Sequence, residues 1–114
     1  MAEDQQLYVV LMQLTDRGAV DTSALADNLA HAVGAFEASG GVILSVDATL
    51  GEFDFVVRCT GLNQETMLAA AYAVARQGMF RTRTLAGAQK ERFDIVERLV
   101  PKEPIGPSPY PRIS

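Results

Sequence analysis

Residues 7–14 restrict the fold of this chain more than any other segment. Their sequence, LYVVLMQL, is apolar at odd and even positions alike and contains β-branched and aromatic side chains. This pattern is typical of a strand that is covered on both faces, and the segment is too short for an average helix. A layer of amphipathic helices covers one face of a sheet, so the other face of this strand needs a second cover.

The rest of the chain alternates between helical and strand-like periods. Apolar residues recur at three- and four-residue steps in two segments, which predicts helices over 22–39 and 64–77. Strands are predicted over 42–50, 53–60 and 79–85. The element order β-α-β-β-α-β favours an α+β, ferredoxin-like plait, because this fold buries two helices on one face of a four-stranded antiparallel sheet. The expected strand order is 4-1-3-2.

Each predicted helix has one apolar stripe that we expect to face the sheet. In the first helix the stripe consists of Leu25, Leu29, Ala32, Val33 and Phe36. In the second helix it consists of Leu68, Ala71, Tyr72 and Ala75. Asn63 is placed to cap the start of the second helix, and Gly78 is placed to cap its end. The one histidine, His31, lies on the far side of the first helix and is expected in solvent.

The chain changes character after the last predicted strand. Residues 88–100 predict a short helix whose apolar residues turn inward, namely Phe93, Val96 and Val100. All five prolines follow in residues 101–114, which predicts an extended arm. We therefore expect a plait domain over 1–87, a helix over 88–100 and a Pro-rich tail over 101–114.

Charge is unevenly distributed along the 114 residues, whose formal net charge is −4 at pH 7. An acidic chain repels phosphate backbones, so we do not expect a nucleic acid partner. Residues 1–60 carry nine acids and two bases, whereas residues 61–114 carry five acids and eight bases. We expect the two halves to neutralise each other within the fold or across an oligomer. The alternative is an anion-binding surface formed by Arg76, Arg81, Arg83, Arg92 and Arg98.

Cysteine usage and the N-terminus indicate the compartment. The single cysteine, Cys59, excludes an internal disulfide, and no CxxC or Cys/His metal spacing is present. We expect Cys59 to be a small buried side chain. The first residues, MAEDQQ, are acidic where a signal peptide is basic, and no apolar run approaches the length of a membrane span. The expected setting is the cytoplasm, with no membrane partner, metal or cofactor.

The first strand predicts an oligomer. Its side chains divide between two faces: Tyr8, Val10, Met12 and Leu14 on one, and Leu7, Val9 and Leu11 on the other. Leaving either set in water would forgo on the order of 1.5–3 kcal/mol for each large side chain. A symmetric partner buries the same patch twice. We therefore expect a homodimer or a larger homo-oligomer, packed sheet against sheet, with a cavity between the sheets.

Three short motifs resemble the GYD-domain family. They are YVVLMQLT at residues 8–15, LGEFDFVV at 50–57 and RTRTL at 81–85, and together they lie within residues 7–87. The resemblance implies a plait of the dimeric α+β barrel group, which includes cofactor-free monooxygenases, isomerases, haem-degrading enzymes and effector-binding domains. Phe53 stands where the family's name has a tyrosine, so this chain lacks that hydroxyl. The helix and arm after the plait look like additions to the family's core.

Asp54 is the first candidate for chemistry. If Phe55 packs under the helices, Asp54 points toward the inter-sheet cavity beside Arg58. A carboxylate in that position could act as a general base or hold a polar ligand. The structural alternative is that Asp54 caps backbone amides or pairs with an arginine.

Other polar side chains are candidates for ligand binding. Arg81 and Arg83 share one face of the last strand and could clamp a carboxylate or a phosphate, although an exposed or inter-subunit pairing with acids is the alternative. Tyr8 could line a pocket with its hydroxyl, although filling the core is the first expectation for an aromatic residue. Asp47, Glu52 and Asp54 lie close in the predicted hairpin and could hold a hard cation, but nothing there fixes six oxygen ligands.

These observations lead to three hypotheses of function. The first is a small accessory or regulatory homo-oligomer that binds a small organic ligand, anionic or aromatic, in the inter-sheet cavity through Tyr8, Arg58, Arg81 and Arg83. The second is a cofactor-independent enzyme, an isomerase, cyclase or monooxygenase, that uses Asp54 with Arg58 or Arg81. The third is a subunit or adaptor that docks on another protein through residues 101–114.

Overall fold

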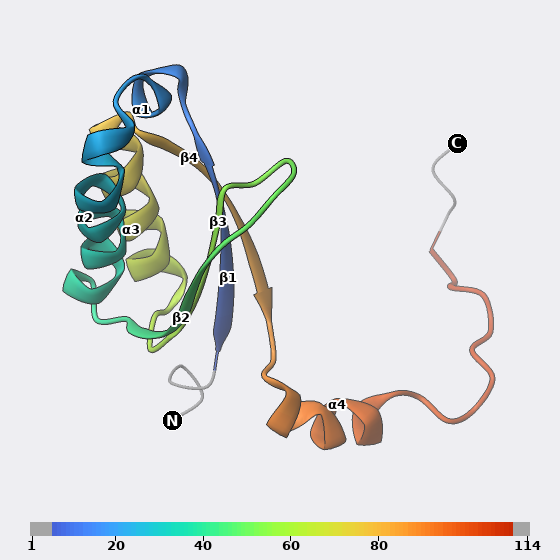
Figure 1. The fold of residues 1–114 in the computed structure, drawn as a ribbon. Coiled ribbons are helices and arrows are strands. Elements are labelled where there is room, and N and C mark those ends of the chain that lie inside the picture. The colour runs from blue at the N-terminus through green and yellow to red at the C-terminus, as the bar shows by residue number, and fades with distance from the viewer. Residues whose placement is uncertain (1–5, 111–114) are drawn as a thin grey trace.

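One four-stranded antiparallel sheet organises the chain in the computed structural model, which describes residues 6–110 (Figure 1). Its strands are β1 (Leu7–Leu14), β2 (Val42–Ala48), β3 (Phe55–Thr60) and β4 (Phe80–Gly87). The strand order is β2-β3-β1-β4, which is the predicted order 4-1-3-2 read from the opposite edge. The predicted α+β arrangement is therefore confirmed, and it is compatible with a ferredoxin-like plait.

Three helices lie on one face of this sheet (Figure 1). They are α1 (Asp16–Val20), α2 (Leu25–Ala38) and α3 (Gln64–Gln77), and a 3₁₀ turn (Thr22–Ala24) precedes α2. α1 occupies a segment for which the sequence analysis predicted no helix. The Thr15 hydroxyl caps α1 by accepting a hydrogen bond of 3.1 Å from the Gly18 amide. Gly18 is needed there because a Cβ atom would collide with the Met79 carbonyl oxygen.

The predicted caps of α3 are confirmed. The Asn63 side chain accepts a hydrogen bond of 2.9 Å from the Thr66 amide, and the Thr66 hydroxyl accepts one of 2.9 Å from the Asn63 amide. This reciprocal pair is a capping box, which satisfies two backbone donors that the helix leaves free. Gly78 ends the helix at φ 75°, a left-handed conformation that glycine adopts without steric cost.

The core lies between the sheet and α2 and α3. The sheet contributes Tyr8, Val10, Met12, Phe55, Val57, Cys59 and Phe80, and the α2 and α3 helices contribute Ala32, Phe36, Met67, Ala70 and Val74. The predicted stripe of α2 is confirmed, because its remaining members Leu25, Leu29 and Val33 pack against this cluster.

The predicted stripe of α3 is wrong by one residue. Met67 is 5% exposed and Val74 is fully buried, whereas Leu68 is 48% and Tyr72 is 71% exposed. α3 is rich in alanine, so two neighbouring stripes have the same helical period and the period does not distinguish them. The observed orientation also leaves the Tyr72 hydroxyl in contact with water, which removes the need for a buried partner.

The β2–β3 connection is longer than the sequence predicted. β2 ends at Ala48 and β3 begins at Phe55, so six residues connect them. The Thr49 amide donates to the Asp54 carbonyl oxygen at 2.9 Å, which closes the loop. Gly51 adopts φ 105° within it, in the region that favours glycine.

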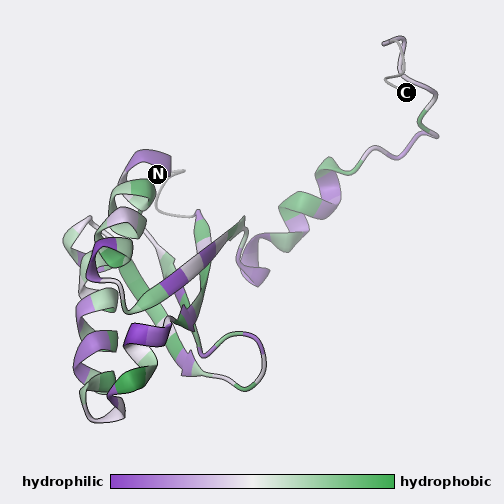
Figure 2. Ribbon diagram, turned by 90° about the horizontal axis from the view of Figure 1, so that it is seen from above, coloured by the Kyte–Doolittle hydropathy of each residue, from purple (hydrophilic) through white to green (hydrophobic). Residues whose placement is uncertain are grey.

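The chain leaves the sheet after β4. A 3₁₀ turn (Lys90–Arg92) leads into α4 (Phe93–Leu99), which lies on the side of the sheet away from α2 and α3 (Figure 1). The expectation that Phe93, Val96 and Val100 turn inward is wrong, since they are 60%, 41% and 56% exposed. Figure 2 shows hydrophobic and hydrophilic stretches alternating along the helix that projects from the plait toward the C-terminus.

Residues 101–110 follow α4 and form neither helix nor strand. The end of the predicted arm, residues 111–114, and most of the acidic N-terminus, residues 1–5, lie outside the described residues. Within the described range, 6–110, no helix combines the length and the hydropathy that crossing a bilayer requires.

Candidate functional site

The sheet face opposite α2 and α3, which we call the open face, carries apolar side chains together with charged and polar ones. Paired residues on neighbouring strands share a face, so the strand register places these side chains in rows. One row contains Asp47, Val56, Leu11 and Arg83, and the next contains Ser45, Arg58, Val9 and Leu85. The two central strands therefore present Val9, Leu11 and Val56 together with one cation, Arg58, and the other charged groups of these rows lie on the edge strands.

Most apolar side chains of the open face remain partly in water, and Leu7, which is 7% exposed, is the exception. Val9, Leu11 and Val56 are half-buried, and Leu85 is 55% exposed. No helix covers them in the described part of the chain (Figure 1). An apolar patch of this kind, rimmed by polar groups, is typical of a surface that contacts a ligand or another protein.

The loop between β2 and β3 projects from the sheet on the side of the open face (Figure 1). The Arg83 guanidinium carbon lies 5.9 Å from the centre of the Phe53 ring, which is a cation–π distance. The Arg83 Nη1 atom is also 3.8 Å from Glu52 Oε1, and both side chains are exposed. Each contact is weak by itself because solvent screens it, but together they bring the loop to β4.

Between this loop and β4 lies a depression of about 300 Å³, which we call the basin. It is lined by Gln13, Phe53, Arg81, Thr82 and Arg83. Two guanidinium groups, one amide and one aromatic ring therefore surround a single space. Guanidinium groups bind carboxylates and phosphates through paired hydrogen bonds, so the basin has the chemistry of an organic anion site.

Asp54 anchors the backbone at the edge of the basin. Its Oδ2 atom accepts a hydrogen bond of 2.8 Å from the Leu14 amide, and its own amide donates one of 2.8 Å to the Met12 carbonyl oxygen. Among the described residues, no ion pair joins Asp54 to Arg58 or Arg81. The geometry thus corresponds to the structural alternative for Asp54, a carboxylate that caps a backbone amide.

The structure separates the predicted ligand residues into two groups. Arg81 and Arg83 meet in the basin, and Arg58 lies on the same face but outside the basin lining. Tyr8 lies on the opposite face, in the core, with 9% of its surface exposed. Tyr8 and the three arginines therefore cannot line one cavity.

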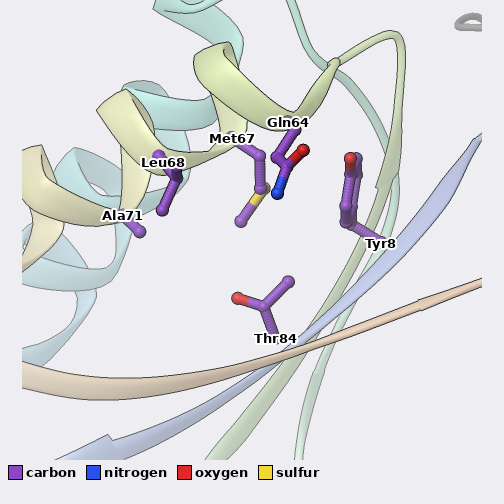
Figure 3. Close-up of a pocket in the computed structure, with 6 residues that line it drawn as sticks. All are labelled: Tyr8, Gln64, Met67, Leu68, Ala71 and Thr84. Atoms are coloured by element: carbon purple, nitrogen blue, oxygen red, sulfur yellow. The ribbon is translucent and has the colours of Figure 1, made fainter.

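Tyr8 instead lines a second pocket, which we call the α3–β4 pocket (Figure 3). Its volume is about 160 Å³, and its lining consists of Tyr8, Gln64, Met67, Leu68, Ala71 and Thr84. The sequence analysis did not identify Gln13 in the basin or Gln64 and Thr84 in this pocket. The sequence could have indicated Gln13, because it is the one polar residue within residues 7–14.

The hypothesis of a cation site in the β2–β3 hairpin has no support from the geometry. Within residues 6–110, no three His, Cys, Asp or Glu side chains come close enough together to share a metal ion. Asp54 is bonded to the Leu14 amide, and Glu52 lies beside Arg83. The three predicted oxygen donors therefore do not converge on one point.

Cys59 and His31 have the burial and the exposure that the sequence predicted for them. Cys59 is fully buried, and this burial raises the pKa of its thiol, so the reactive thiolate is disfavoured. His31 is exposed on α2, and its Nδ1 atom lies 2.7 Å from the Asp27 carbonyl oxygen. Neither side chain contributes to the basin or to the α3–β4 pocket.

Comparison with known proteins gives one family and one fold. The family model described as "GYD domain" matches residues 8–96, which extend from β1 into α4. No curated protein matches the chain in sequence. Among solved structures, the C-terminal domain of the MgtC protein from Mycobacterium tuberculosis superposes with a TM-score of 0.51 at 13% identity. The match covers 79% of this chain and 97% of that domain, and at this identity it shows a shared fold alone.

Proposed function

The chain belongs to the GYD-domain family, and on that premise we propose that it is a small homo-oligomeric protein that binds an organic anion in the basin on its open face. The proposal concerns binding in an accessory or regulatory role. It assigns the acidic group of the ligand to Arg81 and Arg83, and the organic part to the Phe53 ring.

The observation that carries this proposal is the pair of guanidinium groups in one depression. Arg81 and Arg83 are two residues apart on β4, so their Cα atoms are separated by about 7 Å along the strand. Both side chains are exposed, and the weak contacts of Arg83 with Glu52 and Phe53 still leave guanidinium N–H groups that can donate to one carboxylate or phosphate group. This concentration of positive charge is local, because the whole chain carries a net charge of −4.

The partner proposed for the open face is a second copy of the chain. The row that crosses the face begins with Asp47 on the β2 edge and ends with Arg83 on the β4 edge. A two-fold axis parallel to the strands sets the β2 edge of one copy over the β4 edge of the other. Each Asp47 would then face the partner's Arg83, while the apolar centres, including Leu11, pack together.

A second copy would also complete the basin. The basin is open to solvent in a single chain, where water screens the attraction between a guanidinium and an anion. A sheet packed about 10 Å above it would exclude much of that water. The same guanidinium–anion contacts are stronger at lower dielectric, whereas the partner's Asp47 carboxylate would compete with the anion for Arg83.

A second candidate function is docking through the C-terminal part of the chain. α4 exposes Phe93, Val96, Leu99 and Val100, and the following segment exposes Ile105 and Tyr110 at 81% and 82%. An amphipathic helix with an unpartnered apolar face favours contact with another protein. Truncation after Val100 tests the role of residues 101–114, because unchanged assembly and ligand binding would remove them from the mechanism.

The contacts of Asp54 favour an anchoring role over general-base catalysis. The only role that its contacts support is the anchoring of Leu14, and no described acid–base partner lies beside it. A catalytic base needs access to the proton that it abstracts, whereas one oxygen of this carboxylate is already engaged by a backbone amide.

Titration of the full chain with benzoate, followed by amide chemical shifts, tests the proposed site. Benzoate combines a carboxylate with one ring, and saturable shifts are expected at residues 81–83. Arg81→Ala and Arg83→Ala should each weaken binding by about tenfold to a hundredfold, because each removes a hydrogen bond to a charged group. Arg76→Ala is the matched control, since it removes the same charge from α3. Equal affinity in all four proteins would contradict the proposal.

A further inference from the structure

We propose that the α3–β4 pocket is a second ligand site, which binds one uncharged aromatic ring carrying a hydroxyl group. This pocket lies on the helix-covered face of the sheet, so it is separate from the basin on the open face. The proposal therefore stands or falls independently of the proposed function. It rests on the size, the lining and the accessibility of the pocket.

The pocket exists because small side chains face each other where α3 passes beside β4. Ala71 on α3 and Thr84 on β4 leave a gap that longer side chains would fill (Figure 3). The floor consists of Met67 and Tyr8, both of which belong to the core cluster. Their packing into the core fixes the floor in position, so the space is largely formed before a ligand arrives.

The volume corresponds to a single ring. The pocket measures about 160 Å³. An apolar protein cavity of about 150 Å³ is sufficient for one benzene molecule. A fused two-ring ligand would need to extend into solvent past Leu68, which is 48% exposed at the mouth of the pocket. That exposed mouth also gives a ligand a route into the pocket.

The lining chemistry distinguishes the ligand further. The lining side chains are mainly apolar, and the thioether of Met67 makes favourable contacts with aromatic rings. Hydrogen-bonding groups come from the Tyr8 hydroxyl, the Gln64 amide and the Thr84 hydroxyl (Figure 3). None of the described lining residues is charged. A neutral ring with one hydroxyl group matches this combination, whereas a carboxylate would lose its hydration without gaining a cation.

The chain itself contains one group of this chemistry. Tyr110 carries a phenol ring and is 82% exposed in the segment that follows α4. The Tyr110 ring could compete with a free ligand, either by folding back into the pocket of its own chain or by reaching the pocket of a second copy. The proposed occupant is a free small molecule, so the Tyr110→Ala variant is needed to test whether the Tyr110 ring occupies the pocket instead.

Titration of the full chain with phenol, monitored by amide chemical shifts, tests the site. We expect saturable shifts at Gln64, Leu68, Ala71 and Thr84, with a dissociation constant in the millimolar range that is usual for so small a ligand. Benzene should bind more weakly than phenol. Thr84→Val removes one hydroxyl at nearly constant volume and should weaken phenol by about two- to tenfold while leaving benzene unchanged.

Ala71→Leu fills the pocket and should abolish the shifts. Ala75→Leu is the matched control, because Ala75 is exposed on the same helix and does not line the pocket. Both variants should remain folded, which the amide spectrum reports directly. Shifts that persist in Ala71→Leu, or that scatter over the surface without saturating, would overturn the proposal. A large gain in phenol affinity in Tyr110→Ala would also overturn it, because the chain's own ring would then be the occupant.

Discussion

Replacing Asp54 by alanine tests whether this carboxylate is a structural anchor. The substitution removes the acceptor for the Leu14 amide, which now donates at 2.8 Å to Asp54 Oδ2 in a partly buried position. A hydrogen bond to a charged group contributes about 1.5–3 kcal/mol, and the orphaned amide adds to the cost of losing it. We therefore expect Asp54→Ala to lower the free energy of unfolding by about 1.5–3 kcal/mol.

Asp54→Asn separates the anchor from the charge. An asparagine oxygen can still accept from the Leu14 amide, as a neutral acceptor whose bond is worth about 0.5–1.5 kcal/mol. This variant should therefore lie between wild type and Asp54→Ala in stability. Glu37→Ala is the control, because it removes an exposed acid on α2.

Urea unfolding at pH 7, followed by circular dichroism at a single protein concentration, measures these differences. The concentration is held constant because assembly would add to the apparent stability. If Asp54→Ala stays within about 0.5 kcal/mol of wild type, as exposed substitutions usually do, the anchoring role is refuted.

Two further predictions address the core. Met67→Ala should lower the free energy of unfolding by about 2–5 kcal/mol, whereas Leu68→Ala should lower it by less than about 1 kcal/mol. If urea unfolding shows the reverse order, Leu68 belongs to the core, as the sequence predicted. Burial raises the pKa of Cys59, so the thiol ionises first in the unfolded chain, near its ordinary pKa of about 8.5. Below that pH the neutral thiol of Cys59 makes its full contribution to stability, and this contribution is lost as the pH rises toward the higher pKa of the folded chain. Above pH 8.5 the free energy of unfolding should therefore fall less steeply with pH in Cys59→Ala than in wild type. An equally steep decline in both proteins would contradict that linkage.

The sequence predicted the sheet better than it predicted the surfaces. The apolar pattern of residues 7–14 correctly indicated a central strand, because β1 lies between β3 and β4. Strand alternation also placed Arg81 and Arg83 on one face. Alternation cannot tell which of two faces the helices cover, and this is why Tyr8 was grouped with arginines that lie on the other side.

The remaining differences between the predictions and the structure, at α4 and at Phe53, also depend on contacts that the local sequence does not determine. The period of α4 indicates an apolar face correctly, but a period does not tell whether that face meets its own chain or another molecule. Phe53 enters the basin because the β2–β3 loop turns back toward β4, a path that depends on tertiary contacts with Arg83. Local sequence does not determine such a path.

We propose that a second copy of the chain covers the open face. Sedimentation velocity of the full chain across the micromolar range tests it, with Leu11→Glu placing a charge at the centre of that face and Leu68→Glu as a control on α3. We predict that wild type and Leu68→Glu sediment with twice the mass of one chain, and that Leu11→Glu sediments as a single chain. If the wild-type protein remains a single chain throughout this range, a second copy does not cover the open face.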